Sequence, residues 1–410
     1  MGIKSIKVKS CIIMFFLLLM FFANVVAVSY TYPVNKNKET SVSSISTLAS
    51  APEFAFESAA QILMEPTTGE ILYANNENEK LLPASVTKVM TMLLLMEQID
   101  SGKITYQDMV TCSTKASKMG GSQIWFKEGE QLSVDECLKA IAVVSANDVT
   151  VAISEKIGGS EENFVKMMND KAKELGMENT CFKNSHGIDE EGHYTTAKDI
   201  AIMSRELITK HPDILKYTSI WQDTLRNGEF GLNSTNKLIR FYDGATGLKT
   251  GSTSQALFNL SGTATRNGTS FIAVVMKAPS SAVRLEEIKQ LLDYGFANYE
   301  VKKVCEKNVV VGDIGINKCV NKTPQVTIKD DITILSEKGT KFETIEKITY
   351  EESLIAPLTS GTSVGKIEIF NKENNEKVGE SQLVISENIE KSSFIDYLKE
   401  SAKHFLIKKN

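Results

Sequence analysis

Residues 83–99 read Pro-Ala-Ser-Val-Thr-Lys-Val-Met-Thr-Met-Leu-Leu-Leu-Met-Glu-Gln-Ile. From Val86 to Ile99 apolar side chains occupy almost every side of the helix that this stretch predicts. Such a helix is buried at the centre of a domain, because it has no polar face to turn toward water. Ser101-Gly102 ends it.

Strands are predicted before and after a helical middle section. Two apolar runs, 59–64 and 70–74, are joined by Pro66-Thr-Thr-Gly69, which predicts an antiparallel hairpin. Ser133-Val-Asp-Glu136 is a capping box that opens a helix to about residue 144. Further helices are expected over 149–157, 164–175, 196–208 and 281–299, and further strands over 246–253, 256–265 and 270–278. This order predicts an α+β fold, with an antiparallel sheet flanked by a helical cluster.

The predicted α+β domain covers residues 53–300, and a different sequence pattern follows it. Short β-type runs separated by polar turns predict a small all-β domain over 301–388. In the tail, 389–410, five lysines stand against three acidic residues. One helical stripe of the tail carries Phe394, Ile395, Leu398, Ala402, Phe405 and Leu406. An amphipathic helix of this kind can associate with an anionic membrane surface; the alternative is that it packs on the β domain.

The N-terminus predicts export. Residues 1–28 combine three lysines with an apolar run and the small-residue site Val25-Val-Ala27, as in a signal peptide. An uncleaved membrane anchor is the alternative, and both place the body outside the cytoplasm. Residues 29–52 are polar and predict a flexible leader.

Composition excludes several classes of function. Losing residues 1–27 removes three lysines and no acidic residue, so the net charge moves from −5 to −8. An acidic body argues against a nucleic-acid partner. Five scattered cysteines remain, without a C-x-x-C pair, which predicts neither a disulfide framework nor a zinc site. Cys305 and Cys319 could pair, although inert thiols are the favoured interpretation. No cofactor or metal is expected.

Three short strings stand in order: Ser85-Val-Thr-Lys88, Ser145-Ala-Asn147 and Lys249-Thr250-Gly251. The first opens a helix, the second falls between two predicted helices, and the third lies on a predicted strand. This set is typical of serine acyl-transferases that act on penicillin-like amides. Single strings recur elsewhere, so order and setting carry the inference; the other matches are Ser363-Val-Gly-Lys366, Ser234-Thr-Asn236 and Ser386-Glu-Asn388.

The first string predicts a nucleophile and its base. Ser85 and Lys88 lie one helical turn apart, so a hydroxyl is placed near an amine. A neutral lysine can activate a serine. Burial, together with repulsion from a second cation such as Lys249, would lower the pKa of Lys88 enough for this role.

The other strings predict groups that handle the substrate. Ser145 can relay a proton to the leaving amine, and the Asn147 amide can orient the substrate and Lys88. A strand carrying Lys249-Thr250-Gly251 offers an edge for an extended peptide, with Lys249 and Thr250 holding a carboxylate. Gly251 permits close backbone approach. The backbone N–H groups of Ser252 and Ser85 could form an oxyanion hole.

With these residues the chain resembles the low-molecular-mass penicillin-binding proteins, specifically the D-alanyl-D-alanine carboxypeptidases. The matching text includes Leu82–Lys88, Val144–Asp148, Asn184-Ser-His-Gly-Ile-Asp189, Gly192-His-Tyr-Thr-Thr196, Gly244–Gly251 and Leu291-Leu-Asp-Tyr-Gly295. The resemblance implies an acyl-enzyme on Ser85, peptidoglycan pentapeptide stems as substrate, and β-lactam antibiotics as covalent inhibitors. It also implies that Arg284 helps to bind the terminal carboxylate. Ser252 stands where the family often has histidine.

Two alternatives remain at this stage. A β-lactamase-like hydrolase would need a dedicated carboxylate for deacylation, and none stands out between Asn147 and Lys249. A non-catalytic wall-binding protein is disfavoured by the intact strings. His186 and His193 lack metal-ligand spacing and are interpreted as structural.

Overall fold

The computed structural model describes residues 53–319, 323–341 and 343–399. The predicted signal segment, 1–28, and the leader, 29–52, lie outside these residues, as does the end of the tail, 400–410.

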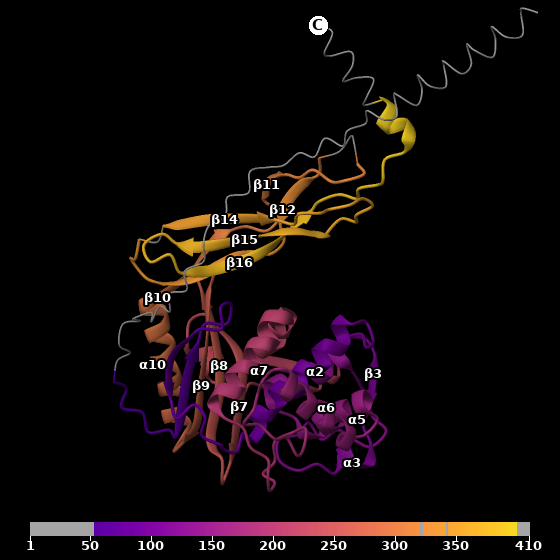
Figure 1. Ribbon diagram of the computed structural model, residues 1–410. Coiled ribbons are helices and arrows are strands. Elements are labelled where there is room, and N and C mark those ends of the chain that lie inside the picture. The colour runs from indigo at the N-terminus through magenta and orange to yellow at the C-terminus, as the bar shows by residue number, and fades with distance from the viewer. Residues whose placement is uncertain (1–52, 320–322, 342, 400–410) are drawn as a thin grey trace, which may run out of the picture. The chain divides into compact units, whose positions relative to one another are not determined.

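The part of the chain predicted as the α+β domain, residues 53–300, contains a five-stranded antiparallel sheet whose strands come from both of its ends (Figure 1). The strand order is β2-β1-β9-β8-β7. These strands are β1 (Ala60–Met64), β2 (Ile71–Asn75), β7 (Ala245–Thr253), β8 (Leu257–Arg266) and β9 (Thr269–Ala278). β1 pairs with β9, with Ala60 opposite Met276, so strands from the two ends of the domain share one sheet. The α+β prediction is confirmed.

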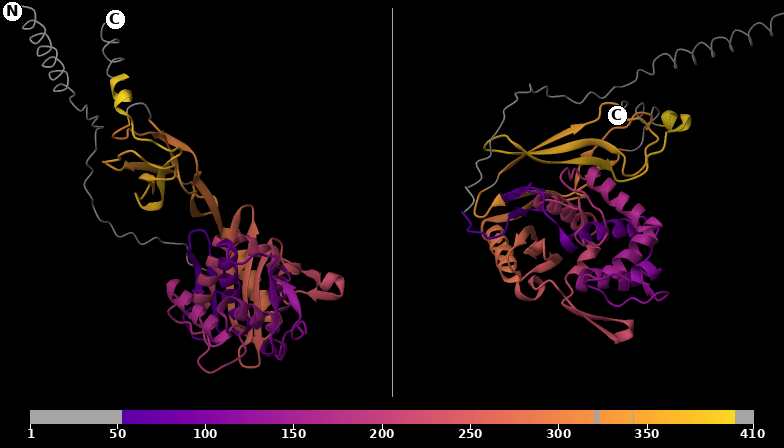
Figure 2. Two further views of the ribbon diagram at one scale, coloured as in Figure 1. Left: turned by 90° about the vertical axis from the view of Figure 1, so that its right-hand side faces the viewer. Right: turned by 90° about the horizontal axis from the view of Figure 1, so that it is seen from below.

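Helices cover both faces of this sheet. Side chains alternate along a strand, so each strand contributes to the core on either face. Ile272, Val274 and Met276 of β9 join the core beneath the helical cluster. Phe271, Ala273 and Val275 point the other way, into the core shared with α10 (Ser281–Asn298). Figure 2 shows the sheet between these two layers. The helical cluster contains α2 (Lys88–Asp100), α4 (Val134–Val144), α5 (Asn147–Gly158), α6 (Glu161–Glu174) and α7 (Ala197–Lys210).

The central helix is buried as its composition predicts. Every residue from Lys88 to Met96 is buried. The stretch does not begin as an α-helix, however, because a 3-10 turn, η1 (Ala84–Thr87), precedes α2. The capping box at Ser133 is present, with the Ser133 and Glu136 side chains bonded to each other's backbone N–H groups.

Several short elements escaped the sequence-based prediction. The strands among them have few large apolar residues in alternation, so no period-2 pattern indicates a strand there. They are β3 (Met109–Thr111), α3 (Thr114–Ser117), β4 (Gln131–Ser133), η2 (Pro212–Ile214), α8 (Leu215–Thr218), β5 (Gln222–Leu225), η3 (Arg226–Gly228), β6 (Phe230–Asn233) and α9 (Leu238–Phe241).

The β part has its own core and two sheets. One sheet has the order β11-β12-β16-β15-β14, and the other pairs β10 with β13. The strands are β10 (Tyr299–Cys305), β11 (Val310–Asp313), β12 (Gln325–Ile328), β13 (Ile332–Glu337), β14 (Thr344–Tyr350), β15 (Ser363–Asn371) and β16 (Lys377–Ile385). The second Ser-x-x-Lys match lies on β15, where Lys366 pairs with Glu368 at 3.0 Å.

The described part of the tail is helical over residues 394–399. Phe394, Ile395 and Leu398 are 61%, 60% and 55% exposed. Among the described residues, no helix combines the length and hydropathy that crossing a membrane requires. Cys112, Cys137, Cys181 and Cys305 are free thiols, so the optional Cys305–Cys319 disulfide is absent.

Candidate active site

Ser85 lies on a tight, partly strained turn. The preceding residue, Ala84, has a φ of +47°, a left-handed conformation that residues with a Cβ rarely adopt. The Thr87 hydroxyl donates to the Ala84 carbonyl at 2.8 Å and lies 2.9 Å from Nε2 of His193. Since Nδ1 of His193 accepts from the Lys183 N–H, Nε2 carries the ring proton and donates to Thr87. This chain of hydrogen bonds fixes the turn that presents Ser85.

Lys88 connects the first two strings. Its Nζ lies 2.9 Å from Ser85 Oγ and donates to Asn147 Oδ1 and to the His186 carbonyl, each at 2.7 Å. The side chain is fully buried, and this burial holds the pKa of Lys88 well below its usual range. The positive charge of Lys249 lowers that pKa further, while Asp148 opposes the shift. Lys88 can therefore present a neutral amine to the Ser85 hydroxyl.

Ser145 and Asn147 are presented by the junction between α4 and α5. Ser145 is the C-terminal cap of α4, with a φ of +65°. Its Oγ is buried and has no hydrogen-bond partner among the described residues, so it retains both its donor and its acceptor capacity. Asn147 is the first residue of α5, and its Nδ2 donates to the Gly120 carbonyl at 2.8 Å. That contact fixes the amide with its oxygen toward Lys88.

A buried carboxylate holds the loop beside Asn147. Asp148 is 1% exposed, and its Oδ2 accepts from the backbone N–H groups of Ile124 and Phe126, each at 3.0 Å. The Asn147 N–H donates to the Ser122 carbonyl of the same loop at 2.7 Å. Asp148 thus fixes one wall of the site without contacting Ser85.

The third string lies on β7, the last strand in the sheet order. Lys249 is buried, and burial together with the charge of Arg284 lowers its pKa to about 7. The Thr250 hydroxyl lies 2.9 Å from the hydroxyl of Thr235. A Cβ on Gly251 would lie 2.7 Å from the Pro83 carbonyl oxygen and 3.0 Å from the Ser85 nitrogen. Only glycine lets this strand approach the nucleophile's turn so closely.

Arg284 lies on α10 and is 7% exposed. One guanidinium nitrogen donates to the Asn259 carbonyl at 3.2 Å, whereas Nε has no partner among the described residues. Burial lowers the pKa of Arg284 to about 10. Its charge acts on Lys249, so these two cations belong to one electrostatic environment.

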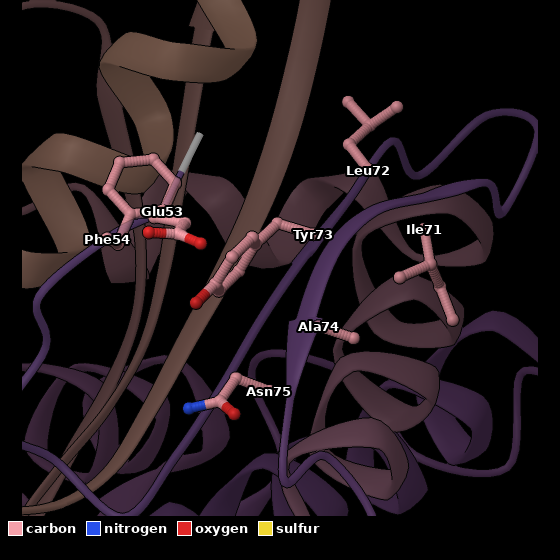
Figure 3. A pocket seen from close by; sticks show the side chains of 7 residues that line it. All are labelled: Glu53, Phe54, Ile71, Leu72, Tyr73, Ala74 and Asn75. Atoms are coloured by element: carbon pink, nitrogen blue, oxygen red, sulfur yellow. The ribbon is translucent and has the colours of Figure 1, made fainter. Parts of the chain in front are cut away.

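A surface hollow elsewhere in the domain contains none of the predicted site residues. Its lining comes from Glu53, Phe54 and the strand β2 from Ile71 to Asn75 (Figure 3). β2 and β7 are the opposite edges of the sheet. The hollow is therefore separate from the group of side chains around Ser85.

Comparison with known proteins identifies the family. Residues 45–280 match the family Peptidase_S11, described as D-alanyl-D-alanine carboxypeptidase. The chain belongs to this family. Residues 299–391 match the C-terminal domain of penicillin-binding protein 5.

Relatives cover most of this carboxypeptidase-family chain. The D-alanyl-D-alanine carboxypeptidase DacF of Bacillus subtilis is 42% identical over 351 residues, which are 85% of this chain and 90% of DacF. The crystal structure of penicillin-binding protein 5 from Haemophilus influenzae has a TM-score of 0.68 at 30% identity, covering 83% of this chain and 99% of that one. Cefotaxime-bound penicillin-binding protein D2 from Listeria monocytogenes has a TM-score of 0.56 at 30% identity, covering 60% and 100%.

Several site groups of this family member had no predicted role. The His186 carbonyl accepts a hydrogen bond from Lys88, and the Thr235 hydroxyl bonds to that of Thr250. No sequence pattern indicates contacts of a backbone carbonyl or of a single threonine. Asn236, in a second Ser-x-Asn match, donates to the Gly247 carbonyl at 3.0 Å and so anchors β7. The string Asn184-Ser-His-Gly187 marks His186 as a structural residue, but it does not show that the His186 carbonyl contacts Lys88.

Proposed function

We propose that this chain is a serine-type D-Ala-D-Ala carboxypeptidase that removes the terminal D-alanine from peptidoglycan pentapeptide stems through an acyl-enzyme on Ser85. The observation that carries the proposal is the 2.9 Å contact between Lys88 Nζ and Ser85 Oγ, made by a buried amine with a lowered pKa. Activating a serine requires such a neutral base within hydrogen-bond reach.

Acylation follows from the positions of these groups. Ser85 Oγ attacks the carbonyl of the D-Ala–D-Ala bond while Lys88 Nζ takes its proton. The N–H groups of Ser85 and Ser252 donate to the oxyanion, which is stabilised as it forms. Ser145, whose Oγ has no other described partner, passes the proton to the leaving amine. Lys249, Thr250 and Arg284 hold the terminal carboxylate, and Asn147 keeps Lys88 in place.

Deacylation distinguishes the carboxypeptidase from the β-lactamase-like alternative. Water, activated by the same Lys88, releases the tetrapeptide and restores the Ser85 hydroxyl. A penicillin adduct is expected to persist, because the amine released from the β-lactam stays attached to the acyl group and blocks the approach of the hydrolytic water. The cefotaxime-bound Listeria relative supports β-lactam binding by this chain.

Labelled penicillin tests the proposal. We expect one adduct per chain, mapped by mass spectrometry to the peptide that carries Ser85, and release of D-alanine from a synthetic peptide ending in D-Ala-D-Ala. An adduct on another residue would contradict the assigned nucleophile. Rapid penicillin turnover without a persistent adduct would favour the β-lactamase. Penicillin binding without D-alanine release would favour a non-catalytic protein.

We further propose the domain organisation that the sequence predicts: residues 1–28 as an export signal, 29–52 as leader, 53–300 as the catalytic domain, 301–388 as the β domain and 389–410 as a membrane-associating tail. The two family matches, to 45–280 and 299–391, support the division of the body. Action on peptidoglycan implies that the body works outside the cytoplasm. External protease added to intact protoplasts should therefore degrade the chain, and full protection would contradict export.

The tail gives a separate prediction. A chain lacking residues 1–28 is expected to float with anionic lipid vesicles, because the apolar stripe inserts and each lysine adds about 1 kcal/mol. Removing residues 393–410 should abolish flotation, and added salt or neutral vesicles should weaken it. Equal flotation of the shortened chain would show that the tail is not the membrane contact.

A further inference from the structure

A polar hollow lies at the end of the sheet where β7 begins, and the proposed function does not use it. Its volume is about 410 Å³, which is within the range of small-molecule sites. The turn between β1 and β2, the C-terminal end of α7, and α8 line one part of it. The start of β7, the end of β8 and the start of β9 line the rest. This hollow is called the Arg205 pocket, after one of its two cations.

Both cations of the Arg205 pocket lack an acidic partner. They are Arg205 and Lys210; among the residues that the structure describes, no aspartate or glutamate lines the pocket and no ion pair involves either cation. Arg205 Nε donates to the Pro66 carbonyl at 2.6 Å, and one terminal nitrogen donates to the Thr67 carbonyl at 3.1 Å. Neutral carbonyls position the guanidinium but leave its charge uncompensated, with N–H groups to spare. On a chain of net charge −5, such a hollow favours an anion.

Hydroxyl groups add neutral donors to the pocket. The Thr246 hydroxyl donates to that of Thr263 at 2.9 Å, so Thr263, which is 1% exposed, keeps its own hydrogen for another acceptor. The hydroxyls of Thr265 and Ser270 lie 2.8 Å apart, and the contact uses only one of their two hydrogens. The Thr67 hydroxyl has no partner in the described part of the chain. The pocket can therefore donate from hydroxyls as well as from cations.

The end of α7 adds acceptors. The last carbonyls of a helix have no partner inside it, and Ile208, Thr209 and Lys210 belong to that last turn. This end of a helix opposes a bare anion, but it suits a ligand whose own hydroxyls donate to the carbonyls. Ile208 and Leu215 offer apolar surface to a carbon skeleton. The ligand that fits all these groups is an anion carried on a polyol.

The number of cations favours phosphate over carboxylate. A phosphate monoester carries close to two negative charges at neutral pH, whereas a carboxylate carries one. Its oxygens can also accept from a guanidinium and an ammonium group at the same time. A phosphate ester therefore matches Arg205 and Lys210 better than a sugar acid does.

We propose that the Arg205 pocket is a second ligand site, which binds a phosphate ester of a sugar or polyol. Arg205 and Lys210 hold the phosphate, while the hydroxyls and the carbonyls at the end of α7 hold the polyol. Thr246 lines the pocket and Thr250 lies four residues further along β7, so the pocket is roughly 13 Å from the proposed active site along that strand. The two sites share no residue, so both can be occupied together.

Phosphorus NMR on the full chain in neutral detergent tests the site, since binding broadens a ligand's phosphorus signal. We expect saturable broadening with glycerol phosphate. Inorganic phosphate should bind at least about threefold more weakly, because it has no hydroxyl-bearing skeleton. Glycerophosphoglycerol distinguishes the source of the ligand: binding shows that a phosphodiester polymer can supply the group, and its absence assigns the pocket to free monoesters.

Variants isolate the pocket. Arg205→Gln should raise the dissociation constant of glycerol phosphate roughly tenfold, as expected for one charge-assisted hydrogen-bonded pair. Lys210→Gln removes an exposed charge and should raise it about threefold. Lys216→Gln is the matched control, because Lys216 lies nearby on α8 but pairs with Asp213 at 2.9 Å and does not line the pocket. It should leave the dissociation constant unchanged.

Penicillin acylation serves as the measure of folding, because Arg205 also holds the turn between β1 and β2. All three variants should acylate at the wild-type rate; if Arg205→Gln does not, Lys210→Gln decides. A wild-type chain that acylates but shows no saturable broadening overturns the site. Wild-type affinity in a folded Arg205→Gln chain, or equal weakening by Lys216→Gln, overturns the role of the pocket cations. None of these results alters the proposal for Ser85, which is tested by acylation and D-alanine release.

Discussion

Lys88→Met is expected to lower the rate of penicillin acylation and of D-alanine release about 10²–10⁴-fold, the range that a general base contributes. Methionine has nearly the length of lysine and no basic nitrogen, so the pocket stays filled while Ser85 loses its proton acceptor. The Ser85 hydroxyl, Asn147 Oδ1 and the His186 carbonyl would each lose the bond to Nζ. Stopped-flow acylation with a fluorescent penicillin measures the rate directly.

Stability should change far less than rate. A fully buried lysine is costly in free energy, and removing it offsets part of the loss of its three hydrogen bonds. Lys366→Met is the matched control, because it removes the lysine of the second Ser-x-x-Lys match, on β15. That variant should acylate at the wild-type rate. A Lys88→Met chain that acylates normally would show that another group takes the Ser85 proton.

The parts of the site that sequence could predict are those set by local spacing. Ser85 and Lys88 are three residues apart at the start of a helix, so their contact follows from helical geometry. Asn147 and Lys249 are far from Ser85 in sequence, and only the ordered set of strings brought them into the prediction. Likewise, the central helix, the hairpin of β1 and β2, and the strands β7 to β9 carry strong apolar patterns, and the structure contains them.

The rest depends on contacts that carry no local pattern. The hairpin β5–β6 reads Gln-Asp-Thr-Leu and Phe-Gly-Leu-Asn, with too few apolar residues to indicate strands, yet it leads to Thr235 beside Thr250. The Lys88 contact at residue 186 uses a backbone carbonyl, which every residue possesses. Composition alone could not show that Asp148 would be buried and satisfied by the loop at Ile124 and Phe126.

Gly187→Ala is expected to cost about 3 kcal/mol of folding free energy, from left-handed backbone strain plus overpacking, and to slow acylation at least about 100-fold. Gly187 has a φ of +89°, and a Cβ there would overlap the Ala84 carbonyl oxygen and lie 2.8 Å from the Thr87 hydroxyl. The overlap can be relieved only if one of two segments moves. These are η1, which carries Ser85, and the backbone at residues 186–187, whose His186 carbonyl accepts from Lys88. Both movements disturb the contact between nucleophile and base.

Gly176→Ala separates the steric effect from the conformational one. Gly176 also has a positive φ, +73°, but a Cβ at that position would meet nothing within 4 Å. Gly176→Ala should therefore lower the free energy of unfolding only by the left-handed strain, about 1 kcal/mol, and leave the acylation rate unchanged. Urea unfolding gives the free energies, and acylation by labelled penicillin gives the rates. If the two alanine variants lose equal stability and acylate equally fast, then close packing of Gly187 against the Ser85 turn does not set the active geometry.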